Sequence, residues 1–75
     1  MLLSIGDIVY TSDSPQVFGK CIAIVEGRYH IQAVHSLLND EGKVVPDKDD
    51  VLPIRFIIGK KGEHMKKRFK KYMEK

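Results

Sequence analysis

The residues with the clearest chemical potential in this 75-residue chain are the basic side chains near its C-terminus. From Lys60 to Lys75 there are eight basic residues against two acidic ones, Glu63 and Glu74, which gives a net charge of +6. Before Lys60 the balance is reversed, with five basic and eight acidic residues. Such a concentration of positive charge attracts phosphate-rich or acidic partners. The alternative is a solvated, lysine-rich end that serves solubility alone.

Two groups of side chains are candidates for contact with nucleic acid. The first is the basic set of the C-terminal segment: Lys60, Lys61, Lys66, Lys67, Arg68, Lys70 and Lys71. The second comes from residues 28–33, where polar and apolar residues alternate as in a half-buried strand. Tyr29, Ile31 and Ala33 then face the core, and the opposite face presents Arg28, His30 and Gln32. The alternative for that polar face is an ordinary solvent-facing strand.

Two aromatic residues, Tyr10 and Phe18, flank the loop Thr11–Val17. Aromatic rings at this place could stack on bases or cover an apolar partner. The alternative is closure of the core, and Phe18 fits that alternative better than Tyr10 does.

No pattern for catalysis or metal binding is present. The three histidines and Cys21 lack the spacing of metal-ligand motifs. Cys21 lies inside an apolar run, which is typical of a small buried residue. The acidic run Asp47–Asp50 lacks the glycine and the distal glutamate of a calcium loop. We therefore predict a protein that is not an enzyme and has no catalytic residue, cofactor, metal site or small-molecule substrate.

The first 59 residues carry the signals of short strands. Apolar and β-branched runs are separated by Gly, Pro and Asp clusters, and Glu26-Gly27 stands between two runs at hairpin length. The expected strands lie at residues 7–10, 18–25, 28–33, 43–45 and 54–58. This pattern predicts a mainly β fold, a small five-stranded antiparallel barrel.

The pattern changes after Gly59. Met65, Phe69, Tyr72 and Met73 recur at the spacing of one face of an α-helix, and lysines flank them. We expect an amphipathic basic helix over residues 60–75 that packs on a barrel formed by residues 1–59. The whole chain, residues 1–75, is then a single domain.

The N-terminal half resembles KOW-type and related Src-homology-3-like (SH3-like) barrels. The resemblance rests on Gly6–Tyr10, on Phe18–Ile24 and on the hairpin to Tyr29-His30-Ile31, and it covers residues 5–34. It implies an SH3-like barrel with bends at Gly6 and Gly19, in which Ile8, Ile22 and Ile24 fill the core. Such barrels bind RNA, DNA, peptides and proteins. The loop Thr11–Val17 departs from the pattern because it is long and has no basic residue.

A second, local resemblance concerns Gly59-Lys60-Lys61-Gly62, which is similar to the Gly-x-x-Gly segment of KH domains. The preceding residues have strand character, and too few residues follow to complete a KH domain. We therefore interpret this match as coincidental.

The charge pattern favours a small regulatory domain that binds nucleic acid, DNA or RNA, through its basic segment. The alternative is a protein-interaction module, such as a small accessory or virus- or plasmid-borne regulator, that docks on the acidic surface of a larger protein. A single cysteine and the lack of a long apolar run predict a cytoplasmic protein without membrane contact.

Overall fold

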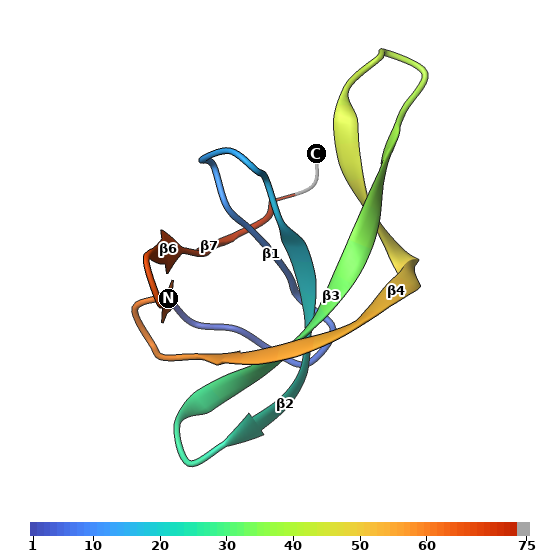
Figure 1. Cartoon of the computed structure of the whole chain (residues 1–75). Coiled ribbons are helices and arrows are strands. Elements are labelled where there is room, and N and C mark those ends of the chain that lie inside the picture. Colours follow the sequence, from blue (N-terminus) through green and yellow to red (C-terminus); the bar gives the residue numbers. More distant parts are fainter. Residues whose placement is uncertain (74–75) are drawn as a thin grey trace.

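The computed structural model describes residues 1–73, and over this range it contains strands and no helix. The strands are β1 (Ile8–Tyr10), β2 (Phe18–Val25), β3 (Arg28–Leu38), β4 (Val44–Ile58), β5 (Glu63–His64), β6 (Lys67–Arg68) and β7 (Lys70–Lys71). Five of them form an open antiparallel sheet in the order β4-β3-β2-β1-β7, and β5 and β6 form a separate hairpin (Figure 1). The mainly β prediction is confirmed, whereas the expected closed barrel is not present.

The β2–β3 hairpin forms as its sequence predicts. Glu26 and Gly27 have φ values of 52° and 76°, the left-handed pair that a tight two-residue hairpin turn requires. Beyond the turn, Tyr29, Ile31 and Ala33 are all buried, in agreement with the alternation in the sequence.

The expected core of the N-terminal half is only partly correct. Ile8 is buried, but Ile22 is half-buried and Ile24 is exposed. The pairing of β2 with β3 shifts by one residue between Cys21 and Ala23. Because of this β-bulge, the side chains that follow Ile22 point to the opposite face of the sheet from the one that simple alternation predicts. The residues after this bulge run toward the exposed turn.

β4 is one long strand where the sequence predicts two separate strands. Its register with β3 shifts twice, between the pairs Gln32↔Arg55 and Val34↔Val51 and again before Ser36↔Pro46. Pro53 lies inside the first shift, where its missing N–H removes no regular ladder bond. The irregular register therefore lets a strand continue through a sequence that contains proline.

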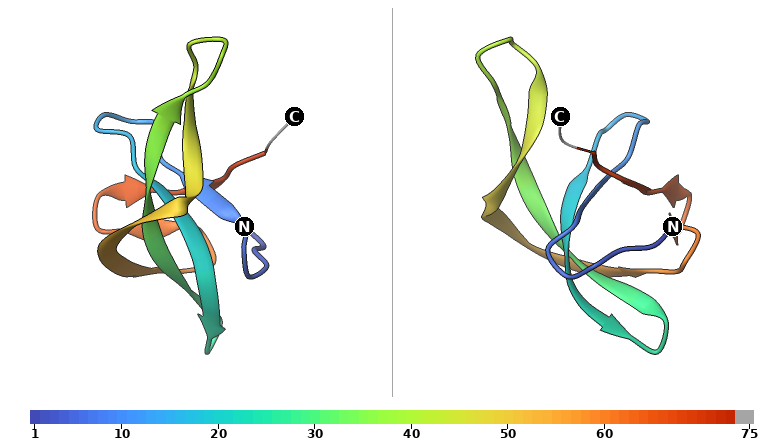
Figure 2. Two further views of the ribbon diagram at one scale, coloured as in Figure 1. Left: turned by 90° about the vertical axis from the view of Figure 1, so that its right-hand side faces the viewer. Right: turned by 180° about the vertical axis from the view of Figure 1, so that it is seen from behind.

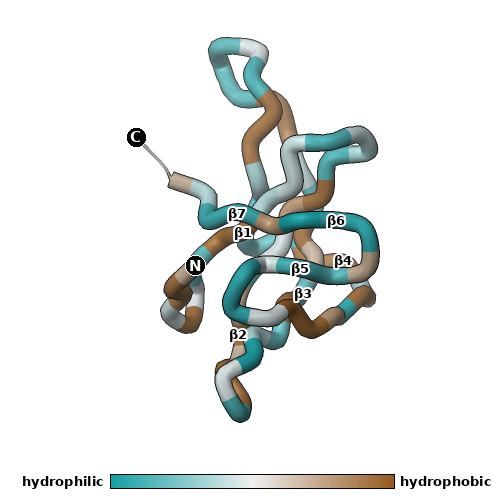
Figure 3. The backbone as a smooth tube through the Cα atoms, turned by 90° about the vertical axis from the view of Figure 1, so that its left-hand side faces the viewer, coloured by the Kyte–Doolittle hydropathy of each residue, from teal (hydrophilic) through white to brown (hydrophobic). Residues whose placement is uncertain are grey.

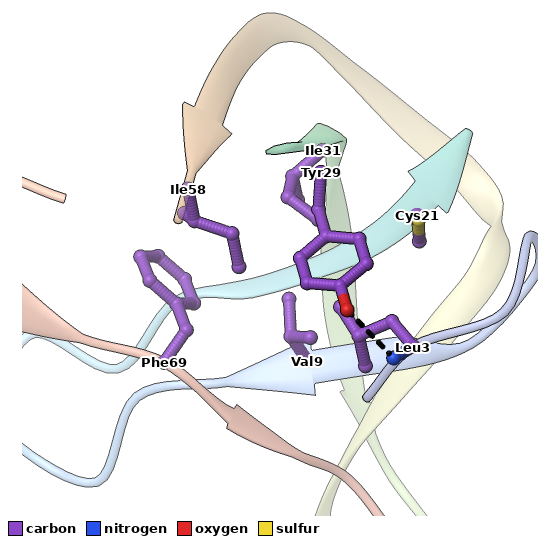
Figure 4. Packing of buried hydrophobic residues seen from close by; sticks show 7 residues of the cluster. All are labelled: Leu3, Val9, Cys21, Tyr29, Ile31, Ile58 and Phe69. Atoms are coloured by element: carbon purple, nitrogen blue, oxygen red, sulfur yellow. Dashed lines mark hydrogen bonds between the residues drawn. The ribbon is translucent and has the colours of Figure 1, made fainter. Parts of the chain in front are cut away.

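Buried side chains from both halves of the chain form the main core (Figure 4). Its members are Leu3, Val9, Cys21, Tyr29, Ile31, Ile58 and Phe69. The Leu3 N–H donates to the Tyr29 hydroxyl at 3.3 Å, which ties the N-terminal segment to β3. A second, smaller cluster of Ile8, Phe18 and Val34 is extended by Tyr10 and Tyr72.

The outer halves of β3 and β4 project from the body as a two-stranded ribbon (Figure 2). Leu37 and Leu38 pair there with Val45 and Val44, and the turn Asn39–Gly42 closes the tip. We call residues 36–46 the ribbon. None of its side chains belongs to either buried cluster.

The predicted C-terminal helix is wrong. Residues 63–71 form short strands, and β7 pairs with β1 through Val9↔Lys71 and Tyr10↔Lys70. Phe69 is buried, but Met65 and Met73 are 92% and 73% exposed, so the expected stripe does not exist. Glu74 and Lys75, the last two residues of the predicted helix, lie outside the described residues.

The physical reason lies in the pairing partner that the segment finds. A surface helix depends on tertiary packing for most of its stability, because helix nucleation is costly. Strand pairing satisfies the free backbone groups of β1 and places Phe69 in the core. One buried aromatic residue is therefore gained without a helix.

Candidate nucleic-acid interface

The segment 60–73 carries seven basic residues and one acidic residue, Glu63. Two turns and three short strands present these side chains. In Figure 3, β5, β6 and β7 lie toward the viewer, with hydrophilic residues along β6 and β7. The strands β6 and β7, which carry Lys67, Arg68, Lys70 and Lys71, thus lie on one side of the molecule, although no helix carries these residues.

Two turns bring lysines to exposed positions. Lys60 and Lys61 lie at the tip of a turn that the Gly62 N–H closes by donating to the Gly59 carbonyl at 2.9 Å. The backbone of Lys60 also accepts a hydrogen bond from the Met1 nitrogen at 2.9 Å.

Gly62 is the residue that this first turn requires. Its φ is +79°, and a β carbon there would overlap the backbone carbonyl of Phe69. The Phe69 N–H donates to the Gly62 carbonyl at 2.8 Å, so the turn packs directly against the buried part of the segment. The backbone of the turn that carries Lys60 and Lys61 is therefore held in place by its contacts with Phe69, a residue of the main core.

The second turn joins β5 to β6 through Met65 and Lys66, and Met65 has a φ of 54°. Both side chains of this turn are exposed. On β7, Lys70 and Lys71 are held by the pairing with β1.

Three of the basic side chains form ion pairs. Arg68 lies 3.4 Å from Glu63, Lys67 lies 3.8 Å from Asp13, and Lys71 lies 3.4 Å from Asp7. Among residues 1–73, the ammonium groups of Lys60, Lys61, Lys66 and Lys70 have no carboxylate within 4 Å. We call these four side chains the basic face.

Asp7 is the best-anchored of these carboxylates. It accepts a hydrogen bond from the Ser4 N–H at 2.8 Å and faces the Lys71 ammonium. Both contacts favour the ionised form and hold the pKa of Asp7 below its usual value, with the backbone hydrogen bond contributing most.

The three polar residues predicted on β3 have different environments. Arg28 is exposed beside the β2–β3 turn, where the Lys60 side chain comes 3.5 Å from the position of a β carbon on Gly27. His30 is half-buried. Of the basic face, Lys60 thus lies close to Gly27, the chain neighbour of Arg28.

Gln32, in contrast, is buried and used within the fold. Its amide nitrogen donates to the carbonyls of Leu52 and Ile54, and its carbonyl accepts a 2.7 Å hydrogen bond from Arg55 Nε. These bonds pin the irregular part of β4 to β3. Gln32 offers no free polar atom to a ligand, so we leave it out of the proposed interface.

An apolar groove of about 390 Å³ lies beside the C-terminal segment. Three phenylalanines line it, and the Phe56 ring centroid is 4.9 Å from that of Phe69 and 5.1 Å from that of His64. We call it the aromatic groove. Its full lining is Gln16, Val17, Phe18, Ala33, Val34, His35, Ser36, Leu52, Ile54, Phe56, His64, Lys67 and Phe69.

Phe56 and His64 are groove residues that no pattern in the sequence marks. Phe69 was expected on a helix, and Phe18 was considered beside Tyr10. The ring of Phe18 is buried between the groove and the second cluster, where its centroid lies 6.4 Å from that of Tyr10. The sequence predicts that Phe69 packs on the body of the protein, and Phe69 is buried, but it lies in an extended segment and not on a helix.

The structure also bears on other kinds of site. In the described part of the chain, no three or more His, Cys, Asp or Glu side chains gather at a place that could hold a metal ion. Burial raises the pKa of the Cys21 thiol, and its Sγ contacts the Ala23 carbonyl at 3.6 Å. Residues 1–73 also contain no helix long and apolar enough to cross a membrane.

Comparisons with protein-family models, with curated proteins and with solved structures find no match to this chain. The KOW-type and SH3-like resemblance therefore stays a prediction, and the site must be interpreted from its own geometry.

Proposed function

We propose that this protein binds nucleic acid through the basic face, as a small regulatory domain without a reaction of its own. The observation that supports this most directly is the set of four exposed lysines that have no carboxylate partner among residues 1–73. They lie within eleven residues of sequence, on turns and a strand held in place by the buried Phe69. Arg28 adds a fifth positive charge nearby.

The physical basis is the release of counterions from phosphates. Each phosphate neutralised on duplex DNA contributes roughly −0.9 to the slope of log affinity against log salt concentration. Four lysine contacts therefore predict a slope of about −3 to −4. Such contacts carry little sequence information, because the phosphate backbone is the same for every sequence.

The test replaces two lysines of the basic face, in the variant Lys66→Gln/Lys70→Gln. Fluorescence anisotropy with a labelled DNA hairpin and a labelled RNA hairpin at several salt concentrations gives the affinity and the slope. We expect the magnitude of the slope to fall by about two units because two phosphate contacts are lost. Glutamine is polar and close to lysine in length, and both positions are exposed, so the stability of the protein should change little.

The matched control is Lys20→Gln/Lys48→Gln, which removes the same charge from β2 and β4 outside the basic face. This control should leave the slope within half a unit of the parent. Equal losses in both variants would show that net charge alone governs binding, and a parent that binds neither probe at about 50 mM salt would overturn the proposal.

A second candidate function is docking on another protein through the ribbon. The ribbon exposes Leu37, Leu38 and Val44, and its tip carries Asp40 and Glu41. Exposed apolar side chains beside acidic ones suit a partner with a basic rim around an apolar surface. If the parent binds no nucleic acid, this candidate takes precedence.

We also propose a cytoplasmic location. The support is Cys21, the single cysteine of the chain, which is buried and unpaired, as expected where thiols stay reduced. Thiol labelling of the protein in intact cells, compared with labelling after unfolding, tests whether this cysteine stays reduced there.

A further inference from the structure

The aromatic groove and the charges around it favour one form of nucleic acid over another. We propose that the groove receives an unpaired base, so that the ligand is a single strand or a loop and not a regular duplex. This inference rests on the proposed function, because the basic face must hold the phosphates on either side of that base.

The first argument is the size and lining of the groove. A volume of about 390 Å³ falls within the range of about 300–1,000 Å³ in which small-molecule sites lie. The wall is apolar, and of its three phenylalanines Phe56 is half-buried and keeps ring surface that a ligand can reach, whereas Phe18 and Phe69 are only 4% and 3% exposed. A flat, weakly polar ring gains from leaving water for such a place, and stacking on aromatic rings is how proteins hold unpaired bases.

The second argument is the position of the polar groups. Gln16, His35 and Ser36 are exposed at the rim, and His64 and Lys67 are half-buried beside the rings. Such groups can bond to the edge of a base whose ring plane contacts the apolar wall. The His64 Nδ1–H donates to the Ile57 carbonyl at 3.1 Å, which leaves Nε2 as the free nitrogen of the ring.

The third argument is charge complementarity at the mouth of the groove. The Lys67 ammonium contacts the Pro15 carbonyl at 3.3 Å and the exposed Asp13 carboxylate at 3.8 Å. An exposed ion pair of this length is weak, so a phosphate can displace Asp13. Lys66, on the neighbouring turn, adds a charge without such a partner among residues 1–73. A ring that enters the groove thus has its phosphate next to Lys67, the lysine that lines the groove.

These features select against duplex DNA and RNA. In a duplex the faces of the bases are stacked and their edges are paired, so no ring can enter an apolar groove without being extruded. A purely electrostatic surface binds duplex and single strand alike. A groove that takes a base adds affinity for the single strand only.

The experiment compares three labelled probes of equal phosphate number by fluorescence anisotropy. They are a single strand, a blunt-ended duplex of two short strands without a loop, and a single strand in which the central bases are replaced by abasic spacers. Each is made as DNA and as RNA. We expect the normal single strand to bind at least about tenfold more tightly than the other two, because stacking of even one base supplies such a factor.

Two variants locate the effect in the groove. Phe56→Leu removes a ring from the wall and should lower affinity for the normal strand to near that for the abasic strand, with duplex affinity unchanged. Ile54→Ser changes an exposed position of the same groove, so it tests the site without touching the buried cores. It should reduce single-strand binding by a few-fold.

The outcomes separate this inference from the proposed function. Equal affinity for all three probes would overturn the inference, and the proposed function would stand if the Lys66→Gln/Lys70→Gln variant still weakened binding to all of them. Loss of duplex and single-strand affinity together in Phe56→Leu would also overturn it. Absence of binding to every probe would overturn both proposals and favour a protein partner for the groove.

Discussion

The ribbon and the C-terminal segment 60–73 are both short parts of the chain at the margin of the fold, and the ribbon projects from the body in Figure 1. They differ in how they are attached. The C-terminal segment sends Phe69 into the main core, pairs with β1 and contributes the buried Gly62. The ribbon adds no side chain to either buried cluster, and its two strands are held to each other by cross-strand pairs. Whether a segment at the edge of a fold stabilises that fold therefore depends on the residues that anchor it to the core, and not on its position at the edge.

Charge follows the same division. The turn of the ribbon carries Asp40 and Glu41, whereas the anchored segment carries the basic face. Rigid attachment suits a surface that must hold several lysines at fixed spacing for a phosphate backbone. The ribbon, which has no residue in the buried clusters, can adapt its shape to a protein partner, and docking on such a partner is the second candidate function.

The sharpest test of this comparison is a pair of large-to-small substitutions. Phe69→Ala should lower the free energy of unfolding by about 3–5 kcal/mol, since a buried aromatic side chain is lost from the core. Leu38→Ala, at a 67% exposed position of the ribbon, should change it by no more than about 0.5 kcal/mol. Urea unfolding followed by circular dichroism measures both. Similar losses in the two variants would contradict the difference in attachment.

A second pair compares two glycines with left-handed backbone. Gly62→Ala should cost about 2–5 kcal/mol, because the left-handed conformation costs about 1–2 kcal/mol and the methyl group also meets the Phe69 carbonyl. Gly42→Ala, in the tip of the ribbon at φ +75°, meets no atom within 4 Å and should cost only about 1–2 kcal/mol. Thermal unfolding of the two variants gives the difference, and equal costs would show that Gly62 is not packed as described.

The smallest expected effect concerns the link between Asp7 and Lys71. The folded-state pKa of Asp7 lies below its unfolded value, so its contribution to stability is complete above the unfolded pKa and is lost as the pH falls through the folded pKa. Asp7→Asn should therefore be less stable than the parent at pH 6, by at most about 1 kcal/mol, and equally stable near pH 2.

Unfolding free energies of the parent and of Asp7→Asn, measured across this pH range, test the link. The control Asp40→Asn removes a charge from the ribbon, where residues 1–73 offer it no ion pair, and should stay within about 0.5 kcal/mol of the parent at pH 6. A difference for Asp7→Asn that does not vary with pH would rule out the proposed role of its charge.

The parts of the fold that could be predicted are those governed by local pattern. The left-handed turn at Glu26-Gly27 and the alternation from Tyr29 to Ala33 define the β2–β3 hairpin without information from elsewhere. The position of β6 and β7 on one side of the molecule, and with them of Lys67, Arg68, Lys70 and Lys71, also follows from their closeness in sequence. These features depend on residues within one strand or turn.

The predictions that were wrong concern features that depend on contacts between residues distant in the sequence. A run with helical spacing at Met65 and Phe69 became strand, because the free edge of β1 lies sixty residues earlier and offers backbone pairing. Gln32 left the solvent because β4 bends over it, and that bend follows register shifts near Pro53. The aromatic groove was missed for the same reason, since Phe18, Phe56 and Phe69 come together only in the folded chain.

The irregular course of β4 has a consequence for how copies of this protein meet. β4 and β7 are the two edges of the main sheet, and an edge with a long, flat row of free backbone groups invites addition of a strand from another molecule. β7 is only two residues long, and β4 is interrupted by two register shifts and two prolines. His64 also occupies the carbonyl of Ile57. The register shifts and prolines of β4 therefore disfavour edge-to-edge aggregation, despite the exposed Val51, Ile54 and Ile57 along β4.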